Sequence, residues 1–385
     1  MNQIPLFKVF MDKSAIEESN KVLSSGYVTQ GPIVENFEDK LKSFFNEDLV
    51  TTTNSATSAL HLVMHMLKTN GLGPEKIKVT GKEDHILTTP LTCTATNWPI
   101  LLNNINLRWV DVDESNCNMD LDDLEEKLNE NTKAVLLVHW GGFPIDLNKL
   151  KKIQDDFNNK FGFKFVIIED CAHAFGSKFN DKLIGSFSNI STFSFQAIKH
   201  LTSVDGGCVI FNDQADFERS KLLRWYGIDR NENRKDFRCE ADISEIGFKF
   251  HMNDVNASIG LANLEPVVND LLPIHISNGN FYNDKLKNIQ GVELMDYTSQ
   301  LEIPYWIYTI KVKNRQEFMK YMDKKNIVTS RVHERNDIHS AVSKYVESLP
   351  NLDKLIDEMV CIPVGWWVSE ESRDYIVRCI KEFYS

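Results

Sequence analysis

A lysine stands in a loop between two segments that have the composition of buried β-strands. The apolar run 189–195 leads into a Ser-Phe-Gln loop that carries Lys199, and Gly206 and Gly207 precede a second apolar run, 208–211. Withdrawal from water lowers the pKa of a lysine toward the free amine. A free amine at the mouth of a sheet can form a Schiff base with a carbonyl compound. Taken alone, Lys199 is more simply interpreted as a solvated loop lysine, so its chemistry depends on its neighbours.

A second reactive group is a carboxylate at the end of a predicted strand. The segment 163–168 is mostly apolar and is followed directly by Glu169 and Asp170. A buried carboxylate is unfavourable unless a cation or several hydrogen-bond donors face it. Asp170 is therefore either a functional partner for a cation or a structural group, namely a helix cap or one half of an ion pair.

A third feature is a turn that could bind an anion. The β-branched run 50–53 is followed by small residues at 54–58, which open a helix predicted to reach residue 68. Small side chains let backbone N–H groups approach a ligand, and a helix N-terminus attracts negative charge. An ordinary capped helix is the alternative, because Asn, Ser and Thr are also preferred capping residues.

The three features together match the requirements of pyridoxal phosphate, which needs an anion site, a carboxylate for its pyridine nitrogen and an amine for its aldehyde. Asp170 would keep the ring nitrogen protonated, so that the ring accepts electrons. Lys199 would bind the aldehyde and then move a proton as general base and general acid.

The elements that must position these groups follow an alternating pattern. Helical stretches separate several strand-like apolar runs, which lie at 85–89, 107–112, 133–139, 163–169, 190–195 and 207–212. This alternation is typical of an α/β domain with a mostly parallel sheet, in which ligands bind at the carboxyl ends of the strands. Beyond about residue 265 the pattern becomes helix 266–288, strand 305–313 and a last helix 369–384. We therefore predict a three-layer large domain over 1–260 and a smaller α+β domain over 261–385.

Composition excludes several classes of function. The chain is 42% hydrophobic and 25% charged with a formal charge of -12, which argues against a nucleic-acid partner. No apolar run is long enough to span a membrane, and the N-terminus lacks a signal-peptide core. The seven cysteines include no Cys-x-x-Cys pair and fit reduced thiols in the cytoplasm. His61 and His65 are spaced as metal ligands, but Leu62 stands where a His-Glu-x-x-His site needs glutamate, so no metal site is expected.

Six segments, in this order, resemble the DegT/DnrJ/EryC1/StrS family of sugar aminotransferases, a fold-type-I branch of the pyridoxal-phosphate enzymes. Their positions are 26–32, 54–60, 138–142, 169–173, 193–199 and 247–260. Each motif is weak alone, whereas their shared order over nearly the whole chain is specific. The resemblance implies an aspartate-aminotransferase-like large domain, with Lys199 as the Schiff-base lysine and Asp170 as the pyridinium partner. It also implies that His173 touches the cofactor ring or its 3′-oxygen.

The resemblance further implies a phosphate site and a shared active site. The backbone N–H groups of Ala56 and Thr57 and the Ser194 hydroxyl would hold the phosphate. A neighbouring subunit of a homodimer would contribute from 247–253, where Lys249 replaces the asparagine of many members.

Other positions concern the substrate and the cofactor ring. His333 and His339 align with a segment that contacts the sugar nucleotide, although both could be surface loop histidines. Where the family commonly has a Thr-aromatic pair, this chain has Thr92 and Cys93. Either Cys93 packs on the ring edge, or a residue such as Trp98 covers the ring face.

The expected function is amination of a nucleotide-linked 3-keto or 4-keto deoxysugar by a cytoplasmic enzyme, with glutamate as amino donor and a surface glycan as the destination of the product. Three alternatives stay open. A dehydratase subgroup of the family carries histidine in place of the lysine, and the retained Lys199 with His200 beside it favours transamination. A non-catalytic sugar-nucleotide-binding protein would not need Lys199 and Asp170 intact. An amino-acid aminotransferase would need an arginine for the substrate carboxylate, which the sequence alone does not place.

Overall fold

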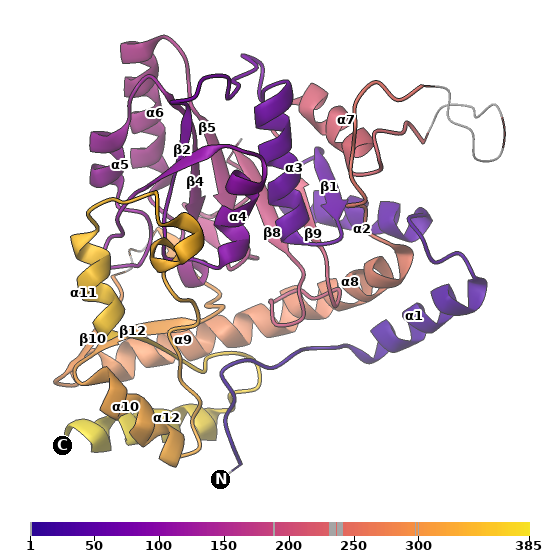
Figure 1. The fold of residues 1–385 in the computed structure, drawn as a ribbon. Helices are drawn as coiled ribbons and strands as arrows, with labels where there is room; N and C mark the ends of the chain where they lie inside the picture. The colour runs from indigo at the N-terminus through magenta and orange to yellow at the C-terminus, as the bar shows by residue number, and fades with distance from the viewer. Residues whose placement is uncertain (1, 188, 231–235, 237–241, 297, 299) are drawn as a thin grey trace.

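The centre of the fold is a seven-stranded sheet with strand order β1-β9-β8-β5-β4-β2-β3 (Figure 1). The computed structural model describes residues 2–187, 189–230, 236, 242–296, 298 and 300–385. The strands are β1 (Val50–Thr53), β2 (His85–Thr88), β3 (Asn106–Trp109), β4 (Thr132–Val138), β5 (Val166–Asp170), β8 (Ile190–Ser194) and β9 (Gly207–Ile210). Within this sheet β9 runs antiparallel to both neighbours, and the remaining pairings are parallel. The predicted α/β class with a mostly parallel sheet is confirmed.

Both faces of the sheet are buried, because successive strand residues point to opposite sides. In β4, Ala134 and Leu136 join one apolar cluster, whereas Val135 and Leu137 join another. The first cluster includes residues of α3 (Ala56–Thr69) and α4 (Thr94–Leu102), and the second includes residues of α2 (Pro32–Phe45), α6 (Leu147–Phe161) and α8 (Asp254–Pro266). The shorter α5 (Leu121–Lys127) and α7 (Gln214–Leu223) complete the helical layers. The result is the predicted three-layer arrangement.

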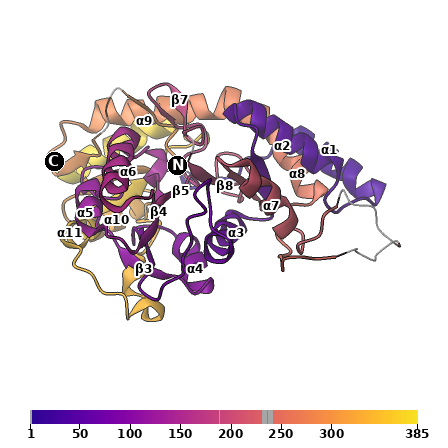
Figure 2. The ribbon, with the colours of Figure 1, turned by 90° about the horizontal axis from the view of Figure 1, so that it is seen from above.

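A long helical rod runs beneath the sheet in Figure 1. Helix α8 passes through a π-helical turn, Val267–Leu271, into α9 (Leu272–Leu286). Pro273 has no N–H to donate to a preceding carbonyl, which accounts for a break in the regular ladder near this point. Helix α1 (Lys13–Ser25) packs along α8, as Figures 1 and 2 both show. The expected domain boundary after residue 260 falls inside α8, and the division into two domains stays a prediction.

The C-terminal elements form a second sheet with helices beside it. The sheet has the order β10-β12-β13, and a third, small sheet has the order β11-β6-β7. Their bounds are β6 (Lys178–Phe179), β7 (Lys182–Leu183), β10 (Val292–Leu294), β11 (Leu301–Glu302), β12 (Tyr308–Val312), β13 (Met359–Ile362), α10 (Arg315–Lys324), α11 (Pro350–Glu358) and α12 (Glu370–Tyr384). The strand expected at 305–313 begins only at Tyr308. Tyr305 has a φ of 43°, and the backbone N–H of Trp306 donates to Gly141 instead of to a strand.

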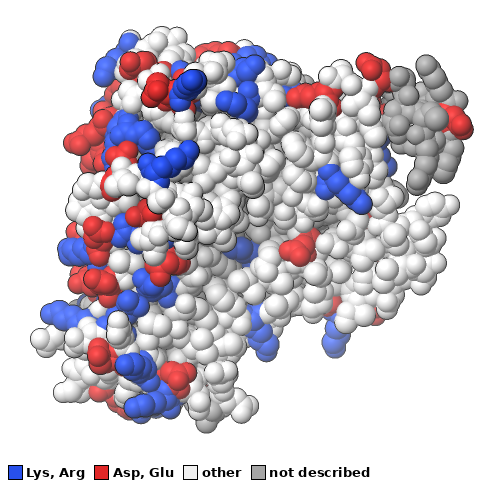
Figure 3. Space-filling view, viewed as in Figure 1, with Lys and Arg blue, Asp and Glu red and all other residues white. Residues whose placement is uncertain are grey.

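Charge is distributed unevenly over the surface. Figure 3 shows side chains of both signs crowded on the left flank, whereas the face over α1 and α8 at the lower right is largely uncharged. Within the described residues, no helix is both long and apolar enough to cross a bilayer. Six cysteines are free thiols, and Cys239 lies outside the described residues.

Replacing Gly279 with alanine tests the packing of the irregular segment against α9. An added Cβ at Gly279 would lie 2.3 Å from the ring of Tyr305. Gly279→Ala should lower the free energy of unfolding by about 1–3 kcal/mol in urea denaturation, since overpacking outweighs the gain in helix propensity. The control Asn280→Ala changes the exposed neighbouring position and should cause no loss. A stabilised Gly279→Ala would contradict tight packing at this contact.

Candidate active site

Lys199 lies in the turn after β8, with its amine against the indole of Trp306. The Nζ atom is 3.5 Å from the ring centroid. Burial lowers the pKa of Lys199 to about 7, against the opposing effects of the Asp170 carboxylate and the Cys93 thiol. This lowered pKa makes the free, nucleophilic amine accessible near neutral pH. Lys199 is only partly exposed and its amine contacts an indole, so it is not a freely solvated loop lysine.

Asp170 is the last residue of β5, on the strand that pairs with β8. Its carboxylate accepts hydrogen bonds from the Thr96 hydroxyl at 2.7 Å and from the Ala172 N–H at 3.0 Å. Burial nevertheless raises the pKa of Asp170, because these two donors and Lys199 offset the loss of water only in part. A cation beside this carboxylate would stabilise its charged form, and a protonated pyridine nitrogen is such a cation.

His173 and His333 lie beside Trp306 as neutral rings. His173 stacks on the indole with centroids 3.9 Å apart, and His333 is parallel to His173 at 5.6 Å. The Nδ1 atom of His173 accepts from the Gly141 N–H at 3.4 Å, which leaves its proton on Nε2. Burial lowers the pKa of His173 well below its usual value and that of His333 to about 4. Both imidazoles can therefore donate or accept a hydrogen bond without adding charge.

The residues predicted to hold a phosphate come together at the start of α3. Ala56 and Thr57 occupy the first turn of this helix, where the helix supplies no acceptor for their N–H groups. Ser194 pairs with Gly207 across β8 and β9. A Cβ on Gly207 would lie 2.5 Å from the Ala56 nitrogen, so only a glycine lets the strand approach so closely. Backbone donors, a hydroxyl and a helix N-terminus in one place fit a phosphate group.

Two of the expected residues lie outside the cluster around Lys199: Lys249 lies beside the turn before α3, and His339 lies against Trp98. The side chain of Lys249 is exposed, and its backbone carbonyl accepts from Asn54 at 3.2 Å. Its contribution to a partner's phosphate site stays a prediction. His339 packs edge-on against Trp98 at 5.9 Å rather than against the rings around Lys199. Of the two residues considered for the cofactor ring, Cys93 is electrostatically coupled to Lys199, whereas Trp98 faces His339.

Three residues that fix the site in place were not predicted from the sequence. Asn336 ties the 331–339 segment to the loop before α4, because its side chain donates to Thr92 and accepts from Asn97. Thr96 orients the Asp170 carboxylate. Trp306 lies in an apolar run that predicts a strand, so the sequence does not mark it as a site residue. An asparagine within a charged loop and a threonine after the Thr-Cys pair carry no distinctive signal.

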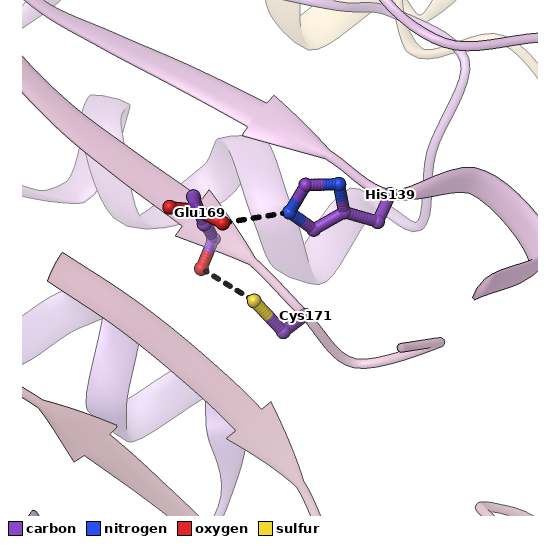
Figure 4. Close-up of side chains that lie close together, drawn as sticks. All are labelled: His139, Glu169 and Cys171. Carbon is purple, nitrogen blue, oxygen red and sulfur yellow. Dashed lines mark hydrogen bonds and ion pairs between the residues drawn. The ribbon is translucent and has the colours of Figure 1, made fainter. Parts of the chain in front are cut away.

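A buried polar cluster of His139, Glu169 and Cys171 includes both sequence neighbours of Asp170 (Figure 4). His139 donates from Nε2 to Glu169 at 2.8 Å and accepts at Nδ1 from the Ile145 N–H at 3.1 Å. The Cys171 thiol donates to the Glu169 backbone carbonyl at 3.6 Å. These residue types could hold a metal ion, but the two histidine nitrogens already have hydrogen-bond partners. We interpret the cluster as a brace that joins the ends of β4 and β5.

The pH dependence of Lys199 modification tests its local environment. Covalent trapping of pyridoxal phosphate on Lys199 with borohydride should rise with pH around a midpoint of about 7, because only the free amine attacks the aldehyde. The exposed Lys40 should be labelled little below about pH 9, since ordinary lysines titrate near 10.4. Peptide mapping by mass spectrometry measures both sites. A Lys199 midpoint close to that of Lys40 would contradict a desolvated amine.

Known proteins share this architecture over its whole length. The model of the DegT/DnrJ/EryC1/StrS aminotransferase family matches residues 10–381. The structure of AtS13 from Actinomadura melliaura is 41% identical, with a TM-score of 0.93 and 99% of each chain covered. The sugar aminotransferase CalS13 from Micromonospora echinospora is 39% identical, with a TM-score of 0.92 over 98% of this chain and 99% of that one. GDP-perosamine synthase from Escherichia coli O157:H7 is 27% identical, with 100% of both chains covered. The chain belongs to the DegT/DnrJ/EryC1/StrS aminotransferase family.

Proposed function

We propose that the protein transfers an amino group from an amino acid to the keto group of a nucleotide-linked deoxysugar, with pyridoxal phosphate as cofactor. The observation that carries the proposal is the Lys199 amine, which titrates near neutral pH beside the buried Asp170 carboxylate. Similarity to a sugar aminotransferase and to a GDP-perosamine synthase supports the substrate class.

The residues around Lys199 and Asp170 fit the cofactor part by part. When bound, pyridoxal phosphate supplies an aldehyde and a ring that accepts electrons. Asp170, held by Thr96 and Ala172, would face the protonated ring nitrogen. Ala56 and Thr57 at the start of α3, with the Ser194 hydroxyl on the adjoining strand, would bind the phosphate.

Lys199 has the properties of a proton carrier near neutral pH. A general base works best when its pKa is close to the pH of the reaction, and the Lys199 pKa of about 7 meets this condition. His173 and His333 are neutral at this pH, so they do not repel the ammonium form. The lysine also separates transamination from the dehydratase alternative, which needs histidine at this position.

The sugar nucleotide would enter beside His333, whose Nε2 is buried and has no hydrogen-bond partner within the described part of the chain. Such a nitrogen gains a bond when a substrate hydroxyl reaches it. His339, which lies against Trp98, would contact a more distant part of the nucleotide sugar. Glutamate is the proposed amino donor, and the cytoplasm, where free thiols persist, is the proposed location.

A homodimer would cover the uncharged face over α1 and α8 in Figure 3. Ile16 and Leu23 on α1 and Tyr27 in the loop after it expose 59%, 57% and 82% of their surface. A groove of about 1030 Å³ lies between this segment and α8. Clustered exposed apolar groups of this kind are typical of an interface.

The first half-reaction can be followed in the visible spectrum of the purified protein. Wild-type protein loaded with pyridoxal phosphate should show a lysine-bound absorption band, which glutamate should bleach. Lys199→Ala should lack the band and lose amine transfer by at least about a thousandfold, because the nucleophile and proton carrier is removed. The control Lys40→Ala removes an exposed lysine and should behave as wild type. Binding of a sugar nucleotide without any band in loaded wild-type protein would favour the non-catalytic alternative.

The dimer prediction can be tested by placing a charge on α1. Leu23→Glu should weaken self-association by at least about tenfold in sedimentation equilibrium, because an unpaired carboxylate would be buried at the interface. Leu102→Glu is the matched control, since Leu102 is 67% exposed on α4. Wild-type protein that is monomeric at micromolar concentration, or equal association of the two variants, would contradict this interface.

A further inference from the structure

Trp306 contacts the amine of Lys199 and lies almost fully buried. Trp306 is only 3% exposed, and Lys199 Nζ lies 3.5 Å from the centroid of its indole. His173 stacks on the same indole with an interplanar angle of 18°. Neither the segments that resemble the family nor the expected cofactor contacts include this residue.

The side chain of Trp306 and the backbone around it are fixed by contacts with three separate parts of the chain. Its Nε1–H donates to the carbonyl of Ile198 at 2.9 Å, directly before the lysine. The backbone N–H of Trp306 donates to Gly141 at 3.0 Å. The two residues before Trp306 are also held: His200 forms a 3.1 Å hydrogen bond to the carbonyl of Pro304, and His275 forms one of the same length to the carbonyl of Tyr305. An indole held in this way keeps a fixed position and orientation beside Lys199.

We propose that Trp306 is a positioning residue for Lys199: its indole face holds the ammonium group, and its N–H fixes the loop that carries the lysine. A cation over an indole face is attracted by the ring quadrupole, most strongly where water is excluded. Holding the amine in one place raises the rate at which it meets a bound aldehyde. This inference rests on the proposed role of Lys199.

The charge environment determines the sign of the expected effect. The titratable groups that face Lys199 are Asp170, Cys93, His173, His200 and His333, and Lys8 and His275 line the same small cavity. Burial lowers the pKa of each of these histidines, so they add no positive charge near neutral pH. Trp306 stabilises the charged form of the amine. Its removal should therefore lower the pKa of Lys199 further and leave the amine less well held.

Two substitutions separate the indole face from its N–H group. Trp306→Leu removes both, whereas Trp306→Phe keeps an aromatic face and loses only the hydrogen bond to Ile198. Trp109→Phe is a matched control, because Trp109 is fully buried and also donates to a backbone carbonyl at 2.9 Å, that of Tyr345. For each protein the labelling rate of Lys199 is measured against pH in two ways. Acetic anhydride labels the cofactor-free protein, and pyridoxal phosphate with borohydride trapping reports attack on the aldehyde.

Trp306→Leu should lower the pH midpoint of both curves by about half to one unit and, like Trp306→Phe, lower the plateau rate with pyridoxal phosphate a few-fold, because both variants lose the hydrogen bond to Ile198. Trp306→Phe should keep the midpoint and lose a few-fold in the plateau rate, and Trp109→Phe should change neither. If every folded Trp306 variant matches Trp109→Phe in both midpoint and plateau rate, Trp306 has only a structural role. That conclusion holds whatever the loss of thermal stability. The acetic anhydride curve needs no cofactor, so failure of pyridoxal phosphate to label wild-type Lys199 would refute the proposed function separately.

Discussion

The site depends on one constraint, which is that an amine and a carboxylate are both withdrawn from water beside each other. Asp170 ends β5, and Lys199 follows β8, the strand that pairs with β5 in parallel. Burial acts in opposite directions on the two groups, raising the pKa of the acid and lowering that of the amine to about 7. Each charge partly compensates for the burial of the other. A charged ligand that binds beside this pair would therefore change the pKa values of both groups.

The remaining elements keep this pair in place from both sides of the sheet. Thr96 at the start of α4 holds the Asp170 carboxylate. On the other face, the His139–Glu169 pair joins the ends of β4 and β5. The C-terminal part of the chain brings Trp306 against the lysine and His333 beside Trp306 and His173. Groups that are fixed before the substrate arrives need little rearrangement during the reaction, which is the usual source of electrostatic catalysis.

Much of the sheet and part of the site can be predicted from the local pattern of apolar and charged residues. Apolar runs predict β2, β3, β4, β5, β8 and β9, because strands buried on both faces are mostly apolar. Asp170 stands out because a charged residue at the end of such a run is unusual, whereas Lys199 in its loop is significant only together with Asp170 and the turn at 54–58. The pattern does not predict α4, which contains Pro99. It also places a strand over Trp306, whereas the positive φ of Tyr305 and the hydrogen bond to Gly141 depend on tertiary contacts. For the same reason, spacing alone does not separate His333, which lies at the site, from His339, which lies against Trp98.

The central claim is that Lys199, Asp170 and the start of α3 together bind pyridoxal phosphate. A crystal structure of the protein grown with pyridoxal phosphate tests it most directly. The account predicts density continuous with Lys199 Nζ, with the ring nitrogen beside Asp170 and the phosphate at the N–H groups of Ala56 and Thr57. A cofactor bound elsewhere, or a ring whose nitrogen faces away from Asp170, would contradict it.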